Sequence, residues 1–343
     1  MFLLAHLSDP HLAPLPTPRI GELASKRLVG YLNWLRKRRA IHRADVLAAI
    51  LADLRSMRAD HIAVTGDLVN IALPAEIANA AQWLEALGPP AQVSVVPGNH
   101  DGYVPGAAAS CARAWTPYVA GDASGPGMPA DDRGEGTASV GGAFDARIRG
   151  GAPQPVRGGP VGEKSDGLDR PHEDPAVRGA FPFLRVRGPV ALIGVSTAVA
   201  TGPLLATGRL GARQIADMTA LLAAAADRFR VVLIHHPPHV VPKAYFRRLV
   251  DAAAFRAAIA RVGPELVIHG HDHARSLEYI DGPHARVPVI GVPSASAAFG
   301  KDHDPAGYNL YRIGGRPGAW TCEVERRALD AHGAVTTCER FAL

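Results

Sequence analysis

Five short apolar runs, each followed at once by side chains that can bind a metal ion, constrain the fold of this 343-residue chain most strongly. One of them, Val93–Val96, leads into Pro97–Asp101, which brings an amide, an imidazole and a carboxylate together. The β-branched run predicts a buried strand, and Pro97 and Gly98 predict the turn that ends it. Polar side chains at the carboxyl end of a buried strand lie where open α/β sheets place their sites.

The other four runs end in the same way, at Asp9-Pro10-His11, Gly66-Asp67, His235-His236 and His269-Gly270-His271-Asp272-His273. One such loop could arise by chance, but five in this order indicate a shared site. Its carboxylate, amide and imidazole donors suit borderline transition metals rather than magnesium or calcium alone. The candidate ligands are Asp9, His11, Asp67, Asn99, His235, His271 and His273. Seven side chains are too many for one ion, so they predict two ions that share a carboxylate.

Helices are predicted between these strands, at residues 44–58, 74–87, 212–226 and 252–262. The alternation of strand and helix predicts parallel pairing with crossover connections. After His273 the pattern changes to short strands separated by glycine and proline. These strands predict a second sheet packed on the first.

Residues 19–43 differ from the rest of the chain in composition, with eight Lys and Arg against a single acid, Glu22. Leu28, Leu32 and Leu35 follow helical spacing, which predicts a basic amphipathic helix. Two interpretations are open for this cap segment. It packs on the domain with a solvated basic face, or it contacts a membrane or an acyl chain.

Residues 121–179 are crowded with glycine and proline and contain few long apolar side chains. Such a segment cannot bury enough surface to offset the entropy lost on ordering. It predicts a flexible insertion, with a mobile lid beside the site as an open alternative. The chain is otherwise predicted to be a single domain over residues 1–343.

The bulk composition excludes several classes of protein. A hydrophobic content of 47% supports a sizeable core. Cys111, Cys322 and Cys338 form no Cys-x-x-Cys pair, which argues against a disulfide framework and for a reducing compartment. No basic region precedes the first apolar run, so no signal peptide is expected, and no stretch is apolar enough to cross a bilayer. These features predict a cytoplasmic protein, and the sequence pI near 9.3 favours anionic partners.

As an ordered set, the motifs resemble those of the calcineurin-like metallophosphoesterase superfamily, in its bacterial phosphodiesterase-type branch. The matching motifs are Asp9-x-His11, Gly66-Asp67, Gly98-Asn99-His100-Asp101, His235 and Gly270-His271-x-His273. The resemblance implies an α/β fold of four layers, in which two mixed sheets are flanked by helices. It also implies two transition-metal ions, manganese, iron or zinc. The first ion would be held by Asp9, His11, Asp67 and His273, and the second by Asp67 as the bridge with Asn99, His235 and His271.

The resemblance also implies roles around the metals. His100 matches the residue that contacts the phosphate and acts as a general acid on the leaving oxygen, while a hydroxide between the two ions attacks phosphorus. Asp101 is a further catalytic candidate and is expected to orient a neighbouring group by hydrogen bonding. For His236, support of the ligands, substrate contact and simple packing are all open. His269 is expected to have a supporting or structural role.

One departure from the family pattern bears on the substrate. The phosphoprotein phosphatase branch carries Asp and Arg shortly after Gly-Asp, where this chain has Asn70 and Ile71. The missing arginine argues against a protein phosphatase and favours a phosphodiesterase acting on a small molecule, such as a cyclic nucleotide or a glycerophosphodiester. No nucleic-acid partner is expected, and the oligomeric state is open.

Two alternatives remain at this point. The basic segment 19–43 favours a lipid-linked phosphate or pyrophosphate as substrate, similar to that of UDP-diacylglucosamine pyrophosphatases, with the enzyme peripheral at the inner membrane face. A non-enzymatic scaffold with degraded ligands is the other, and the intact ligand set argues against it.

Overall fold

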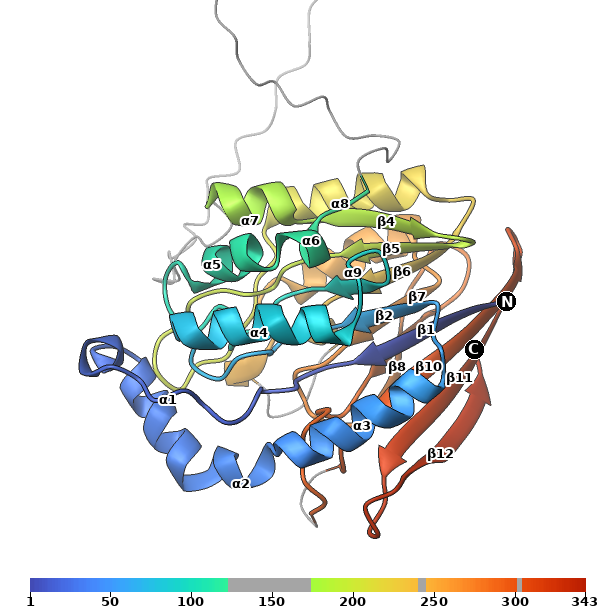
Figure 1. Ribbon diagram of the computed structural model, residues 1–343. Coiled ribbons are helices and arrows are strands. Elements are labelled where there is room, and N and C mark those ends of the chain that lie inside the picture. Colours follow the sequence, from blue (N-terminus) through green and yellow to red (C-terminus); the bar gives the residue numbers. More distant parts are fainter. Residues whose placement is uncertain (123–173, 240–244, 301–303) are drawn as a thin grey trace, which may run out of the picture. The chain divides into compact units, whose positions relative to one another are not determined.

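The computed structural model describes residues 1–122, 174–239, 245–300 and 304–343. These residues contain two six-stranded sheets (Figure 1). The strands of the first are β1 (Phe2–Leu7), β2 (His61–Val64), β3 (Val93–Val95), β10 (Gly307–Arg316), β11 (Ala319–Leu329) and β12 (Val335–Ala342). The strands of the second are β4 (Phe183–Arg187), β5 (Val190–Gly194), β6 (Phe229–Leu233), β7 (Leu266–His269), β8 (Ser276–Ile280) and β9 (Val287–Gly291). Their spatial orders are β12-β11-β10-β1-β2-β3 and β4-β5-β6-β7-β9-β8.

Helices lie on the outer faces of both sheets. The longer ones are α3 (Ala44–Ser56), α4 (Pro74–Leu87), α5 (Ala107–Ala114), α8 (Ala212–Ala224) and α9 (Ala252–Val262). The shorter ones are η1 (Ile20–Leu23), α1 (Arg27–Asn33), η2 (Trp34–Arg38), α2 (Arg39–Ile41), α6 (Thr116–Val119), α7 (Pro175–Ala180) and η4 (Tyr245–Arg247). The predicted helices at 74–87 and 252–262 match α4 and α9, whereas α3 and α8 end two residues earlier than predicted.

Alternating side chains of the second sheet show how the layers pack. On β5, Val190 and Leu192 belong to a core shared with the first sheet and with α3 and α4. Their neighbours Ala191 and Ile193 belong to a separate core with α8 and α9. Successive residues of a strand point to opposite faces, so the second sheet is buried on both sides. The order helix, sheet, sheet, helix confirms the four-layer fold (Figure 1).

The strand pairing confirms one sequence prediction and corrects another. Strands β1, β2 and β3 are parallel to one another, as are β5, β6, β7 and β9, which agrees with crossover connections. The prediction that the strands after His273 form the second sheet is wrong. Strands β10, β11 and β12 extend the first sheet through antiparallel pairing of β10 with β1, and β8 and β9 complete the second.

The cap segment 19–43 is helical, but its leucines do not face the domain. Leu28, Leu32 and Leu35 are 47%, 42% and 48% exposed. The opposite row packs instead, with Trp34 buried and Gly30 so close to Tyr103 that a Cβ would collide with the tyrosine hydroxyl. The domain-facing row is Lys26, Gly30, Trp34, Arg38 and His42, at intervals of four residues.

Most of the predicted insertion at 121–179 lies outside the described residues. Its last six residues are described, and Asp174 begins helix α7 by accepting a hydrogen bond from the amide of Ala176 at 2.9 Å. As for membrane spans, every helix in the described part of the chain is too short or too polar to cross a bilayer.

A buried carboxylate ties the three antiparallel strands of the first sheet together. Glu325 on β11 is 2% exposed and accepts hydrogen bonds from Arg312 on β10 at 2.8 Å and from Thr337 on β12 at 2.6 Å. Burial alone would raise its pKa, but hydrogen bonds from Thr337, Arg340 and Arg327 outweigh burial and lower that pKa from 4.5 to about 2. The charged form of Glu325 therefore stabilises the folded protein.

This pKa predicts a pH-dependent stability difference between the wild type and Glu325→Gln. Because the folded pKa is lowered, the stabilisation is complete above the unfolded pKa of 4.5 and is lost as the pH falls towards 2. We expect Glu325→Gln to cost about 2 kcal/mol at pH 7 in urea unfolding, since water screens the partly exposed arginines. The cost should shrink as the pH falls below 4.5. A cost that stays constant down to pH 2 would contradict the role of the charge.

Candidate metal centre

The five motif loops meet where the parallel strands of both sheets end. Asp9 and His11 follow β1, Asp67 follows β2, and Asn99 follows β3 in the first sheet. From the second sheet, His235 follows β6, and His271 and His273 follow β7. Because parallel strands carry their carboxyl ends to one edge of a sheet, the topology brings all seven predicted ligands together.

The first predicted ligand set is compact. Nε2 of His273 lies 3.2 Å from Oδ1 of Asp9 and 3.3 Å from Nε2 of His11. Nε2 of His11 lies 4.0 Å from Oδ1 of Asp9 and 3.9 Å from Oδ2 of Asp67. Asp9, His11 and His273 therefore lie within 4.0 Å of one another, and the Asp67 carboxylate adjoins them beside His11.

The second predicted set is equally compact and shares Asp67 with the first. Nε2 of His235 lies 3.4 Å from Oδ2 of Asp67 and 3.1 Å from Oδ1 of Asn99. Nδ1 of His271 lies 2.8 Å from Oδ1 of Asn99 and 3.3 Å from Nε2 of His235. The same oxygen, Oδ2 of Asp67, is thus near imidazoles of both sets.

Backbone carbonyls orient the imidazole rings. Nδ1 of His11 donates to the carbonyl of Val69 at 3.2 Å, and Nδ1 of His235 donates to that of Thr65 at 2.6 Å. Nε2 of His271 donates to the carbonyl of Arg247 at 2.8 Å. These hydrogen bonds leave the opposite nitrogen of each ring facing the cluster with a free lone pair, which is how protein metal sites orient their histidines.

The cluster has more acceptors than donors, as a cation site requires. Oδ1 of Asp9 is buried and accepts no hydrogen bond among the described residues. In the second set, Asp67, Asn99 and His271 present acceptor atoms once the carbonyls have fixed the rings, and the only ligand proton facing them is the one on Nε2 of His235. The residues present therefore fit two metal ions, because oxygen and imidazole donors converge and a cation can replace that proton.

The electrostatics agree with this fit. Burial alone would lower the pKa of His235, but the Asp67 carboxylate, with Asp9 nearby, raises it to about 10. Burial alone would raise the pKa of Asp67, yet His235 and His100 hold it well below its ordinary value. The carboxylates therefore favour positive charge in the cluster, which a proton or a metal ion can supply.

The backbone of the cluster is strained in a pattern that follows the ligands. Among the described residues, eight non-glycine residues have positive φ, and five of them are Asp9, His11, Asp67, His271 and His273. Each such conformation costs about 1–2 kcal/mol for an L-residue. Strain of this kind persists at functional sites where the surroundings enforce it.

Two glycines let the loops approach the carboxylates closely. A Cβ on Gly98 would collide with Oδ1 of Asp67, and a Cβ on Gly270 would lie 2.5 Å from Oδ2 of Asp9. These contacts explain why glycine stands before Asn99 and His271.

The two catalytic candidates lie differently. The His100 ring stacks on Tyr103 at 5.5 Å between centroids, and its Nδ1 donates to the carbonyl of Asn70. Its Nε2 therefore faces the cluster. Asp101 is fully buried, and both its oxygens accept backbone amides, from Gly98 and Asp67 at 2.8 Å and from Leu68 and Val69 at 3.0 and 3.1 Å. Asp101 thus holds two ligand loops in place and has no oxygen left for a substrate.

The two remaining predicted residues pack behind the ligands. Nε2 of His236 donates to the carbonyl of Ala206 at 3.0 Å, and its Nδ1 accepts from the hydroxyl of Thr197 at 2.6 Å. Its ring lies 4.2 Å from that of His271. Nδ1 of His269 donates to the carbonyl of Gly270 at 2.9 Å. Both rings are engaged by protein groups and support the loops.

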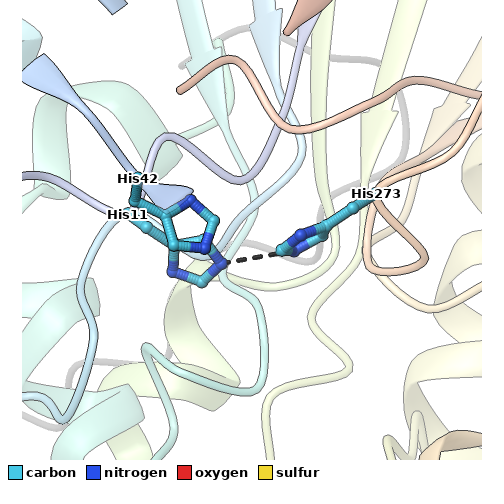
Figure 2. A group of neighbouring side chains, drawn as sticks. All are labelled: His11, His42 and His273. Carbon is cyan, nitrogen blue, oxygen red and sulfur yellow. Dashed lines mark hydrogen bonds between the residues drawn. The ribbon is translucent and has the colours of Figure 1, made fainter. Parts of the chain in front are cut away.

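Two further residues, Arg38 and His42, reach the cluster from the cap segment, and neither belongs to a sequence motif that predicts the site. Arg38 donates through NH2 to Nε2 of His11 at 2.7 Å and through NH1 to Nε2 of His100 at 2.6 Å. The ring of His42 lies 4.3 Å from that of His11, and ring nitrogens of His11, His42 and His273 lie within 4.8 Å of one another (Figure 2). The four-residue interval between Arg38 and His42 is the signal that could have revealed them.

The chain is similar in sequence to a known protein family. The model of the calcineurin-like phosphoesterase family matches residues 2–186, which include the six predicted site residues from Asp9 to Asp101. The remaining predicted ligands, His235, His271 and His273, lie beyond the match, and the structure brings them to the same cluster. No curated protein sequence matches the chain.

The likeness to solved structures is at low sequence identity, and the first of them shows the same fold. A purple acid phosphatase from yellow lupin (Lupinus luteus) seeds has a TM-score of 0.51 and 12% identity, over 99% of this chain and 53% of the lupin chain, so this chain spans about half of that protein. NAD nucleotidase from Haemophilus influenzae has a TM-score of 0.44 and 11% identity, over 99% and 49% of the two chains. A Vps29 mutant from Entamoeba histolytica has a TM-score of 0.37 and 12% identity, over 100% and 99%. The family match, which covers more than half of the chain, shows that the protein belongs to the calcineurin-like phosphoesterases.

Proposed function

We propose that this protein is a phosphodiesterase that uses two metal ions and acts on a small-molecule phosphodiester. The observation that supports this most is the pair of four-ligand sets that share Oδ2 of Asp67, with Nε2 of His100 directed towards them. When bound, two such ions supply the positive charge that stabilises phosphate oxygens and acidify a water molecule.

Three side chains of the protein have separate roles in this proposal. Asp67, between the two sets, would hold both ions. His100, whose ring the Asn70 carbonyl fixes through Nδ1, takes up a proton on Nε2 when substrate displaces Arg38 from that nitrogen, and passes this proton to the leaving oxygen. The Asp101 carboxylate accepts hydrogen bonds from four backbone amides and so holds the loops of Asp67 and Asn99 together.

The loop after Asp67 supports a diester over a monoester. The amides of Asn70 and Ile71 donate to the buried Glu76 carboxylate at 2.7 and 3.1 Å, and the Asn70 side chain donates to the carbonyl of Leu12. This loop therefore offers no cation to a phosphate. A monoester dianion needs more positive charge than a diester, which carries a single negative charge.

The test is hydrolysis of bis(p-nitrophenyl) phosphate by metal-stripped protein that has been reconstituted separately with manganese, iron and zinc. We expect metal-dependent turnover and little activity on p-nitrophenyl phosphate, the matching monoester. Turnover of the monoester alone would contradict the diester proposal. Failure to hydrolyse either ester with any of the metals would contradict the function as a whole.

The structure also favours a second candidate, a lipid-linked phosphate or pyrophosphate. Leu28, Leu32 and Leu35 form a half-exposed apolar face beside the basic side chains of the cap segment. A pocket of about 470 Å³ adjoins this face and lies between residues 13–17 and 31–45. Its lining includes Leu35 from the apolar face and His42, the neighbour of His11. An acyl chain could occupy such a pocket while its phosphate lies at the metals.

Vesicle binding tests this candidate. If the apolar face enters a membrane, the triple variant Leu28→Ser, Leu32→Ser, Leu35→Ser should bind phosphatidylglycerol vesicles roughly 100-fold more weakly than the wild type, because three leucines lose their burial in lipid. Leu204→Ser, at another exposed leucine, is the control and should bind like the wild type. Equal sedimentation of the triple variant and the wild type would contradict membrane contact through this face.

A further inference from the structure

Arg38 lies at the centre of the site although it belongs to the cap segment. Its guanidinium bridges two imidazoles, with NH2 donating to Nε2 of His11 at 2.7 Å and NH1 donating to Nε2 of His100 at 2.6 Å. It therefore lies between a predicted ligand of the first metal ion and the proposed general acid. In a phosphoesterase, the substrate phosphate binds between the metal ions and the general acid.

The guanidinium has no anionic partner of its own. Within the described ranges, Arg38 forms no ion pair with a carboxylate, and its two hydrogen-bond acceptors are neutral ring nitrogens. Burial lowers its pKa, and Asp67 and Asp9 oppose this only through space. Arg38 is partly buried, and a cation in such a position without a paired anion is costly; an anionic ligand that binds beside it reduces that cost.

A metal ion at His11 would increase the need of Arg38 for an anionic partner. Nε2 of His11 is the ring nitrogen that faces the cluster, since Nδ1 donates to Val69. A metal ion held by His11 would take the lone pair that Arg38 now contacts, so the guanidinium would lose an acceptor and would lie beside added positive charge. A phosphate oxygen supplies both the missing acceptor and the negative charge, and a planar guanidinium matches phosphate geometry well.

We propose that Arg38, a residue of the cap segment, is a phosphate-binding residue of this enzyme and supplies a single positive charge, which matches the single negative charge of a diester. This inference rests on the proposed phosphoesterase function. It identifies the residue that neutralises the substrate and explains why a helix outside the motif loops packs against the site.

The neighbouring contacts fix Arg38 in place. Arg27 donates to the carbonyls of Ile71 and Ala72 at 3.0 and 2.7 Å, and Lys26 donates to the hydroxyl of Thr201 at 2.9 Å. With the buried Trp34, these contacts attach the domain-facing row of the helix to the loops around the metal centre. The arginine is therefore positioned before substrate arrives, which lowers the entropic cost of binding.

Phosphate binding by the metal-loaded protein tests the proposal independently of turnover. In calorimetry with inorganic phosphate, we expect Arg38→Ala to bind about 10-fold to 100-fold more weakly than the wild type. The value of kcat/KM for bis(p-nitrophenyl) phosphate should fall about 100-fold. Arg38→Lys should recover part of the phosphate affinity and part of kcat/KM, because lysine keeps the positive charge but lacks the two parallel N–H donors of a guanidinium. Arg36→Ala, at an exposed arginine of the same helix, is the matched control and should behave as the wild type.

Metal content, measured by mass spectrometry on each variant, separates the outcomes. Two ions per chain with weakened phosphate binding in Arg38→Ala supports the proposal. Unchanged phosphate affinity in this variant overturns it, and so does loss of the ions, which would mean that Arg38 orders the metal ligands instead. Failure of the proposed function would appear differently, as a wild type that hydrolyses no ester although it binds phosphate through Arg38.

Discussion

An Asp67→Asn protein is expected to retain neither metal ion firmly and to lose at least about 1,000-fold in kcat. Oδ2 of Asp67 lies 3.9 Å from Nε2 of His11 and 3.4 Å from Nε2 of His235, so one oxygen serves both ligand sets. Asparagine keeps the shape of the side chain but removes its charge and one of its two oxygens. The measurements are metal content after gel filtration and turnover of bis(p-nitrophenyl) phosphate.

The control for this variant is Asp227→Asn, at an aspartate 69% exposed on the surface. It should bind metal and turn over substrate like the wild type. Oδ1 of Asp67 accepts the amide of His100 at 2.7 Å, a bond that asparagine can keep, so circular dichroism should show a folded variant. An Asp67→Asn protein that holds two ions and works at the wild-type rate would exclude Asp67 as the bridging ligand.

His100→Gln should separate catalysis from metal binding. The proposed role of His100 is to protonate the leaving oxygen, and loss of a general acid lowers kcat by about 100-fold to 10,000-fold. The loss should be larger for an alkyl leaving group than for p-nitrophenolate, which leaves readily without a proton. The measurement compares kcat for a p-nitrophenyl diester and an alkyl diester, alongside metal content.

His100 is not among the predicted ligands, so His100→Gln should keep two ions per chain. His332→Gln, at an exposed histidine, is the control and should change neither quantity. An equal loss with both leaving groups would show that His100 only binds phosphate. Loss of metal would place it among the ligands.

Sequence patterns could predict the parts of this structure that depend on neighbouring residues. Helix α4 matches its predicted limits because Pro74 occupies its first turn and Gly88 follows its last residue. The predicted ligands converge because strand ends are set by the local change from apolar to polar residues. Parallel pairing then brings those ends to one edge without further information.

The parts that could not be predicted depend on long-range contacts. Strands β10 to β12 follow Gly- and Pro-rich turns, and nothing local indicates that β10 pairs with β1 rather than starting a new sheet. The role of Arg38 was hidden because the leucines of the cap segment form the more obvious stripe. The row of side chains that packs against the domain contains Lys26, Gly30 and Trp34. Because only one of these residues is a large apolar side chain, the row shows no hydrophobic periodicity in the sequence.

The position of strand β1 also has a consequence for the order of folding. His6 pairs with Ala63 on one side and with Asn309 on the other, so β1 joins a nearby segment to a very distant one. Contacts of large sequence separation form slowly, because a long loop must close before they contribute. The edge of β1 that faces β10 is therefore completed late, and until then it is an unpaired edge on which other chains can add. Asp9 and His11 directly follow β1, so the metal centre is a late product of folding.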